Sequence, residues 1–202
     1  MSLLLTPAPK SVWIAGAEVP IQSDFRTSIR YELMMQDRST PSAELLIAAL
    51  ELYYDCVPEP LEEAVEQMEW FYLCGKDAPS PRRGGARAGQ AVYSFEHDDA
   101  RIYAAFLTQY QIDLQSVPYM HWWTFKGLFD NLSPETTFVK IMQYRSAEIS
   151  PKMSDEQKKF YRDMKRLYAL PLPKAEQQKL NDIEEALLNG GDVQSILGGD
   201  QH

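Results

Sequence analysis

The stretch QYQIDLQSVPYMHWWTFKGLFDNLSPETTFVKIMQY, residues 109–144, decides the fold of this chain. It holds the paired tryptophans Trp122 and Trp123 among many Tyr, Phe, Met and Leu residues. Each aromatic side chain can bury about 150–250 Å² of surface, so helices that carry several of them can anchor a whole core. The expected core anchors, from this stretch and its neighbours, are Trp70, Phe106, Trp122, Trp123 and Phe138.

Two helices are predicted inside this stretch. Ser116 is a plausible N-cap for the first, which would begin at Val117-Pro118 and run to about Phe129. The second would open at Pro134 behind Ser133, because Ser is a preferred cap and Pro is tolerated at the first helical position. We therefore expect the other elements to close around this helical pair.

The residues before this stretch predict one small hairpin and then helices. Residues 11–21, SVWIAGAEVPI, alternate as a β-hairpin with Gly16-Ala17 at the turn. Helical spacing begins at Asp24, with Ser23 or Asp24 as cap, and again at Thr40-Pro41, where Thr40 would be the cap. The helix after Pro41 is apolar nearly all round, so we expect it to be central.

A third helix, residues 61–74, should end at Gly75 as a C′ residue. Its polar face carries four carboxylates, Glu62, Glu63, Glu66 and Glu69. Such a row could bind a metal ion, but no histidine or second acidic helix with ligand spacing accompanies it. A solvated face is the favoured interpretation, helped by negative charge near a helix N-terminus.

Two basic segments are candidate partner-binding sites. The flexible loop expected at about residues 76–91 is rich in Pro, Gly and Arg and contains Arg82, Arg83 and Arg87. Downstream, a capping box at Ser154–Gln157 opens a helix predicted to bury its aromatic stripe. The stripe consists of Phe160, Tyr161, Met164, Leu167 and Tyr168, and the opposite, basic face includes Lys158, Arg162 and Lys165. That face could bind an acidic partner or nucleic acid. It could also neutralise the acidic part of the same chain, or of a second copy in a homo-oligomer.

The chain divides into a helical domain, residues 1–171, and a C-terminal helical tail, residues 172–202. The tail carries a modest amphipathic pattern with Leu180, Ile183 and Leu187, and ends in a Gly-rich stretch. We expect it to be partly disordered, with the helix as a further candidate partner-binding element. The predicted fold class is mainly α: a compact multi-helix domain with a small N-terminal β-hairpin and this tail.

Composition narrows the possible functions. The net charge of −9 argues against general nucleic-acid binding, because phosphates would be repelled. The two cysteines form no CxxC pair, and no apolar run approaches the ~20 residues of a membrane span, so a reducing cytoplasm is expected. GxSxG, GxGxxG and HExxH motifs are absent, and His121 and the His97-Asp98 pair lack catalytic partners. We expect neither an enzyme nor a cofactor.

Six blocks of the chain resemble the bacteriophage gene-product-fifteen family of tailed phages and prophages. The blocks are DFRTSIRYELMMQD (24–37), WFYLCGK (70–76), YSFEHDDARIYAAFLTQYQIDL (93–114), MHWWTFKGLFDNL (120–132), FVKIMQYRS (138–146) and FYRDMKRLYALP (160–171). Together they cover roughly residues 10–171, and the tail departs from the family pattern.

The resemblance implies a protein of the phage tail module, encoded near the tape measure gene. It implies a non-catalytic tail assembly chaperone that binds the tape measure protein, or other tail proteins, in the host cytoplasm. The alternative is a structural component of the tail or of the head–tail connector. A regulatory nucleic-acid binder that uses the basic segments is a more remote alternative.

Overall fold

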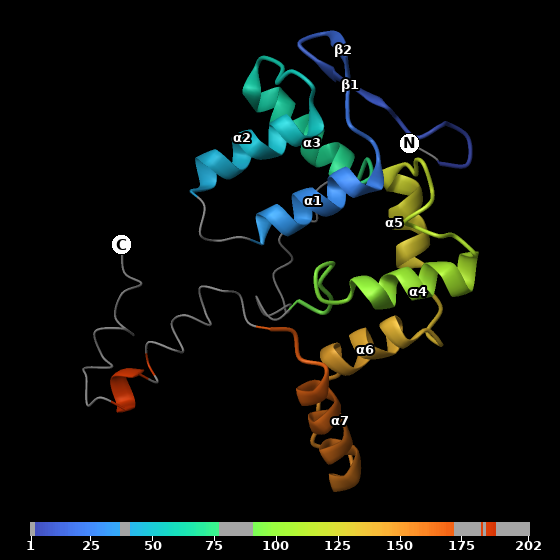
Figure 1. Ribbon diagram of the computed structural model, residues 1–202, viewed down its shortest axis with the longest axis vertical. Helices are drawn as coiled ribbons and strands as arrows, with labels where there is room; N and C mark the ends of the chain where they lie inside the picture. The colour runs from blue at the N-terminus through green and yellow to red at the C-terminus, as the bar shows by residue number, and fades with distance from the viewer. Residues whose placement is uncertain (1–2, 37–40, 77–90, 172–182, 184, 189–202) are drawn as a thin grey trace.

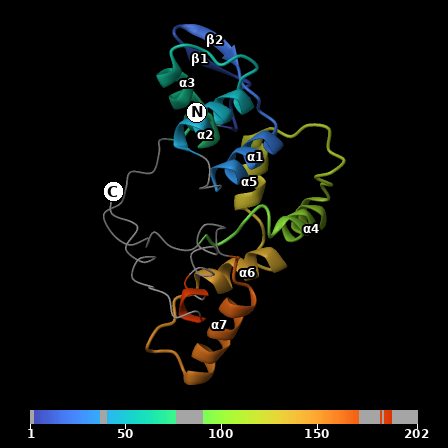
Figure 2. The ribbon, with the colours of Figure 1, turned by 60° about the vertical axis from the view of Figure 1, so that its left-hand side comes forward.

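The computed structural model describes residues 3–36, 41–76, 91–171, 183 and 185–188. The elements follow in the order β1 (Ser11–Ile14), β2 (Ala17–Pro20), α1 (Phe25–Met35), α2 (Ser42–Tyr53), α3 (Leu61–Tyr72), α4 (Asp99–Tyr110), α5 (Trp122–Asp130), α6 (Thr137–Ser146) and α7 (Asp155–Leu167). The predicted fold class, mainly α with a small antiparallel hairpin, is confirmed. In Figures 1 and 2 the hairpin and α1–α3 form one end of the molecule, and α7 projects from the other.

The hairpin lies against α3 through one face of β1. Val12 and Ile14 are buried, whereas Trp13 between them is 65% exposed, as the alternation of a strand requires. The turn residues are Ala15 and Gly16, both with positive φ, and not the predicted Gly16-Ala17. A two-residue turn with two left-handed residues matches the twist of the strands, which explains the shift by one residue.

The end of the hairpin is joined to the start of α5 by backbone hydrogen bonds. The Trp122 N–H donates to the Ser23 carbonyl at 2.8 Å, and the Phe25 N–H donates to the Met120 carbonyl at 2.9 Å. Asp24 also caps α1 as predicted, because its carboxylate accepts the Arg26 N–H at 3.0 Å. The two helices therefore begin side by side, which places α5 at the centre of the fold.

Aromatic side chains from α1, α3 and α4 stack on α5. Phe125 is fully buried between Phe25 of α1 and Phe106 of α4, with ring centroids 4.8 Å and 4.9 Å away. Trp122 stacks on Tyr72 at 5.6 Å. The indole N–H groups of Trp122 and Trp123 donate to the carbonyls of Tyr72 and Phe71, at 2.8 Å and 2.7 Å. These bonds engage two of the last carbonyls of α3, which lack an i+4 partner in the helix, and the Phe71 carbonyl also accepts the Cys74 N–H at 3.0 Å.

The predicted starts of α5 and α6 are wrong by several residues. The N-cap of α5 is His121, whose ring Nδ1 accepts the Trp123 N–H at 3.0 Å, while Ser116 lies in the preceding turn. The N-cap of α6 is Thr136, and Ser133 instead accepts the Glu135 N–H in the turn before it. The α2 N-cap position is held by Pro41; Thr40 lies outside the described residues.

The prediction that α2 is central is also wrong. Only Ala49, Leu50 and Tyr53, in its second half, are buried. Leu46 and Ile47 in the first half are 42% and 54% exposed. The helix is apolar on more sides than α1 and α3 can cover, so part of that surface faces solvent.

Candidate partner-binding surfaces

The residues predicted to bind a partner are divided among three parts of the chain. Arg82, Arg83 and Arg87 of the basic loop and Leu180 of the tail lie outside the described residues. Ile183 and Leu187 belong to a short helical piece, where Ile183 is partly buried and Leu187 is 67% exposed. Lys158, Arg162 and Lys165 belong to α7, so the surface of α7 is the predicted candidate site that the structure describes.

The apolar stripe of α7 is only partly covered, although burial was predicted. Phe160 and Tyr168 pack on Tyr144 of α6, with ring centroids 5.9 Å and 6.1 Å away. The helix contains no buried residue, and Phe160 and Leu167 are 47% and 66% exposed. Lys165 instead lies against α6, where its Nζ donates to the Arg145 carbonyl at 3.0 Å. Lys158, one i+7 step before Lys165, is only 22% exposed in its side chain. The side of α7 that contacts α6 thus holds Lys165 together with part of the apolar stripe, while Leu167 remains exposed.

A buried ion pair fixes the end of α7 to the rest of the protein. The Arg145 guanidinium of α6 binds both carboxylate oxygens of Asp98, whose side chain is fully buried. Arg145 Nε also donates to the Tyr168 carbonyl, just beyond α7, at 2.6 Å. Burial alone would raise the pKa of Asp98, but hydrogen bonds from Arg145 and the Ser94 N–H and the charges of Arg145 and Arg101 hold that pKa below its ordinary value. Asp98 is therefore a structural anion, engaged by arginines and not available as a metal ligand.

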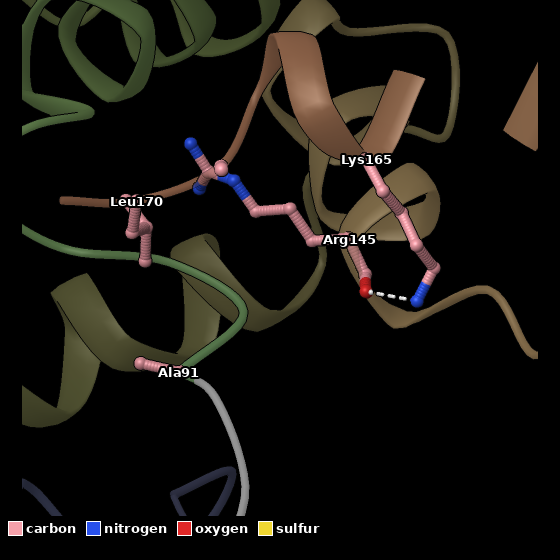
Figure 3. A pocket seen from close by; sticks show the side chains of 5 residues that line it. Ala91, Arg145, Lys165 and Leu170 are labelled. Atoms are coloured by element: carbon pink, nitrogen blue, oxygen red, sulfur yellow. Dashed lines mark hydrogen bonds between the residues drawn. The ribbon is translucent and has the colours of Figure 1, made fainter. Parts of the chain in front are cut away.

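The cavity beside this ion pair is too small for an organic ligand. Figure 3 shows Arg145 and Lys165 extending from α6 and α7 next to Ala91 and Leu170. The cavity measures about 40 Å³, far below the ~300 Å³ at which ligand pockets begin. Its cationic groups are already bonded to Asp98 and to a backbone carbonyl, so we assign it no ligand.

A wider apolar groove opens at the other end of the molecule, between α1, α2 and α3. It has a volume of about 230 Å³ and is lined by Tyr31, Met35, Ser42, Leu45, Leu46, Ala49, Met68 and Glu69. Met35 and Leu46 are 48% and 42% exposed, and Ile47 lies beside Leu46 in the sequence with 54% exposure. None of the predicted partner-binding residues lines this groove. The sequence feature that indicates an exposed apolar surface here is the number of apolar residues in α2, which is too large for one buried face.

His121 has a structural role. It is 7% exposed, and its Nε2 lies 2.8 Å from the Pro9 carbonyl oxygen while Nδ1 accepts the Trp123 N–H. These contacts fix the neutral tautomer with the proton on Nε2. Burial lowers the pKa of the ring, against the opposing effect of the Pro9 hydrogen bond. Both nitrogens are occupied, so the ring serves as a helix cap.

The five expected core anchors lie around the same centre. Phe106, Trp122, Trp123 and Phe138 are buried, and Trp70 is partly buried with its ring 5.5 Å from that of Trp123. Among the described residues, no group of three or more His, Cys, Asp or Glu side chains is arranged to hold a metal ion. No helix within the described ranges is long and apolar enough to cross a membrane. Of the acidic face of α3, Glu63 accepts the Ala15 N–H and Glu69 lines the groove.

Comparison with known proteins gives one match. A family model described as Bacteriophage Gp15 protein matches residues 5–170. No curated protein and no solved structure matches the chain. The matched range includes all the helices α1–α7 and ends before the C-terminal tail.

Proposed function

The chain belongs to the bacteriophage Gp15 family, and from this premise we propose that it is a tail assembly chaperone that binds the tape measure protein. Family membership points to a phage structural or assembly protein. We base the chaperone role on what a tape measure protein would require of its partner. A tape measure protein is a long helical chain, and its apolar faces need to be covered before the tail tube forms around it. The expected site of action is the host cytoplasm.

The apolar groove between α1, α2 and α3 supports this proposal most directly. Amphipathic helices are commonly recognised by apolar grooves that receive side chains at i, i+3, i+4 and i+7. The groove supplies partly exposed side chains from Met35 and Leu46, with the buried Met68 in its lining, and Met side chains adapt to varied partners. Glu69 adds a carboxylate beside this apolar lining, which favours a client helix with a basic flank.

A non-catalytic role is part of the proposal. The two residues that could suggest acid–base chemistry, His121 and Asp98, use their polar atoms in a helix cap and in an ion pair. Neither borders the groove. The groove therefore offers shape and apolar surface, which is what binding without turnover requires.

Co-expression with the cognate tape measure protein tests the proposal. The wild-type chain should keep the tape measure protein soluble and co-purify with it. Leu46→Glu should abolish co-purification, because it places a charge in the groove lining. Leu107→Glu on α4 is the matched control, since Leu107 is 43% exposed, the same within a percent as Leu46 at 42%, and lies outside the groove lining.

The two variants must both be folded for the comparison to count, as judged by far-UV circular dichroism and thermal unfolding. Equal binding by Leu46→Glu and Leu107→Glu would refute the groove assignment. An insoluble tape measure protein alongside the wild-type chain would refute the chaperone role. Mass spectrometry of purified virions separates the alternatives, because a structural tail protein is present at fixed copy number and a chaperone is missing.

A further inference from the structure

The two helices that form most of the apolar groove, α2 and α3, are strongly acidic. Residues 41–75, which contain both helices, carry eight carboxylates and no Lys, Arg or His. All eight are exposed: Glu44, Glu51, Asp55, Glu59, Glu62, Glu63, Glu66 and Glu69. This part of the surface therefore has a negative potential, which raises the local concentration of cationic partners.

Three of these carboxylates form a row beside the groove. Glu62, Glu66 and Glu69 are spaced i, i+4 and i+7, so they share one side of α3. Glu69 lines the groove, so this acidic row begins at the edge of the groove. Glu44 and Glu51 lie nearly half a turn round α2 from the residues that line the groove, so they face away from it.

The charge of Glu69 acts on the lining of the groove. Tyr31 lies in that lining, with its ring edge-on to Tyr53 and Tyr72 at centroid distances of 5.6 Å and 4.9 Å. Burial raises the pKa of the Tyr31 hydroxyl, and the charge of Glu69 raises that pKa further. Arg30, which precedes Tyr31 in the sequence, is not among the lining residues. The groove thus offers a carboxylate and a hydroxyl oxygen, and both can accept hydrogen bonds from a lysine or arginine side chain.

The size and the charge of the groove decide which occupant fits it. On α2 the lining extends from Ser42 to Ala49, about 10 Å at 1.5 Å per residue, which is the length of about two turns of a helix. A second copy that docked through the same surface would form a symmetric contact and place like charges against each other. A cationic amphipathic helix avoids this repulsion, because its apolar side chains can enter the groove while its Lys or Arg side chains reach the acidic row.

We propose that the groove recognises a cationic amphipathic helix of about two turns, and that the acidic row determines this specificity. Because the specificity belongs to the same groove, it rests on the proposed function. The recognised part of the client is a short segment with apolar residues at i, i+3 or i+4 and i+7, flanked by Lys or Arg. The row attracts such a segment and rejects an equally apolar segment with acidic flanks. Glu66 and Glu69 are therefore specificity-determining residues.

Two synthetic peptides with the same apolar pattern test this specificity. Each is a helix of about 18 residues with Leu at i, i+3, i+4 and i+7, and the flanks carry Lys in one peptide and Glu in the other. Binding to the full chain is measured by fluorescence anisotropy, and in 0.1 M salt the Lys peptide should bind about tenfold more tightly. Raising the salt to 1 M shortens the Debye length from ~10 Å to ~3 Å, so it should weaken the Lys peptide and strengthen the Glu peptide.

Two double variants separate the acidic row from the overall charge. Glu66→Gln/Glu69→Gln should weaken binding of the Lys peptide about fivefold, because it removes two carboxylates from the row. Glu44→Gln/Glu51→Gln is the matched control, since it removes two exposed carboxylates from the far side of α2 and should change the affinity little. All four positions are exposed, so both variants should stay folded, which circular dichroism verifies.

Equal affinities for the Lys and Glu peptides would overturn the proposed specificity, and so would equal weakening by the two double variants. A concentration-dependent increase in mass that Leu46→Glu abolishes would also overturn it, because the occupant would then be a second copy. If neither peptide binds while the tape measure protein still co-purifies, the charge specificity fails and the proposed function stands. If the Lys peptide binds as expected but the tape measure protein does not co-purify, the proposed function fails and the specificity of the groove stands.

Discussion

Gly75 offers a sharp test of how closely α3 approaches α5. It lies just past the C-terminus of α3 with φ of 70°, and its N–H donates to the Trp70 carbonyl at 2.9 Å. A Cβ added at Gly75 would lie 2.8 Å from Cη2 of Trp123 and 3.3 Å from Cζ2 of Trp70. Gly75→Ala should therefore destabilise the protein in two ways: through backbone strain and through a clash inside the aromatic core.

The two costs can be separated with Gly16. This residue has φ of 77°, close to that of Gly75, but an added Cβ would meet nothing within 4 Å. Gly16→Ala should cost only the left-handed conformation, about 1–2 kcal/mol. Gly75→Ala should cost the same strain plus about 1–3 kcal/mol of overpacking against Trp123. The expected difference between the two variants is thus about 1–3 kcal/mol.

Urea unfolding, followed by tryptophan fluorescence and circular dichroism, measures both variants. Trp123→Phe removes the atom that the new methyl group meets, so Gly75→Ala should cost less in that background than in the wild type. Equal destabilisation by Gly75→Ala and Gly16→Ala would show that Trp123 does not press on this turn. The packing of α3 against α5 would then need revision.

Three further predictions concern polar groups. Asp98→Asn should cost about 3–5 kcal/mol, because it leaves the Arg145 charge buried without its anion. Since the folded pKa of Asp98 is lowered, the wild type should lose this contribution as pH falls below about 4, and an acid titration of Asp98→Asn should lack that loss. Because the folded pKa of His121 is lowered, the contribution of this residue to the free energy of unfolding is present above about pH 6.5 and declines as the pH falls below that value. His121→Asn, which keeps a cap acceptor, should flatten that part of the stability–pH curve. Burial raises the pKa of the Cys74 thiol to about 11, so at pH 8 a thiol reagent should modify exposed Cys56 first and Cys74 much more slowly; equal rates would contradict the burial of Cys74.

Local signals in the sequence predicted the elements that depend on local bonds. The Ser154–Gln157 capping box and the Asp24 cap are both present, because each is completed by residues within three positions. The start of α5 could not be predicted in this way. Arg26 Nη2 donates to the carbonyls of Leu114 and Val117 at 2.9 Å and 2.8 Å, so those carbonyls bond to α1 and not within a helix. That competition comes from a residue about ninety positions away.

The candidate binding surfaces also depend on contacts between distant parts of the chain, which local sequence patterns do not predict. The amphipathic pattern of α7 predicted a basic helix but not how the helix lies against α6. Its position depends on the packing of Tyr144 on Phe160 and Tyr168 and on the hydrogen bonds of Lys165 and Arg145. The groove requires three helices to leave Leu46 and Met35 uncovered between them, and no single helix pattern contains that information. The apolar excess in α2 was visible in the sequence, but its interpretation as a central helix was wrong.

Photo-crosslinking from the groove tests the central claim most directly. A benzoylphenylalanine in place of Leu46 lies in the groove lining, and one in place of Leu107 has the same exposure on α4. When the cognate tape measure protein is co-expressed, the probe at residue 46 should crosslink to it and the probe at residue 107 should not. Crosslinking at 107 equal to that at 46, or co-purification of the tape measure protein without any crosslink at 46, would contradict binding in the groove.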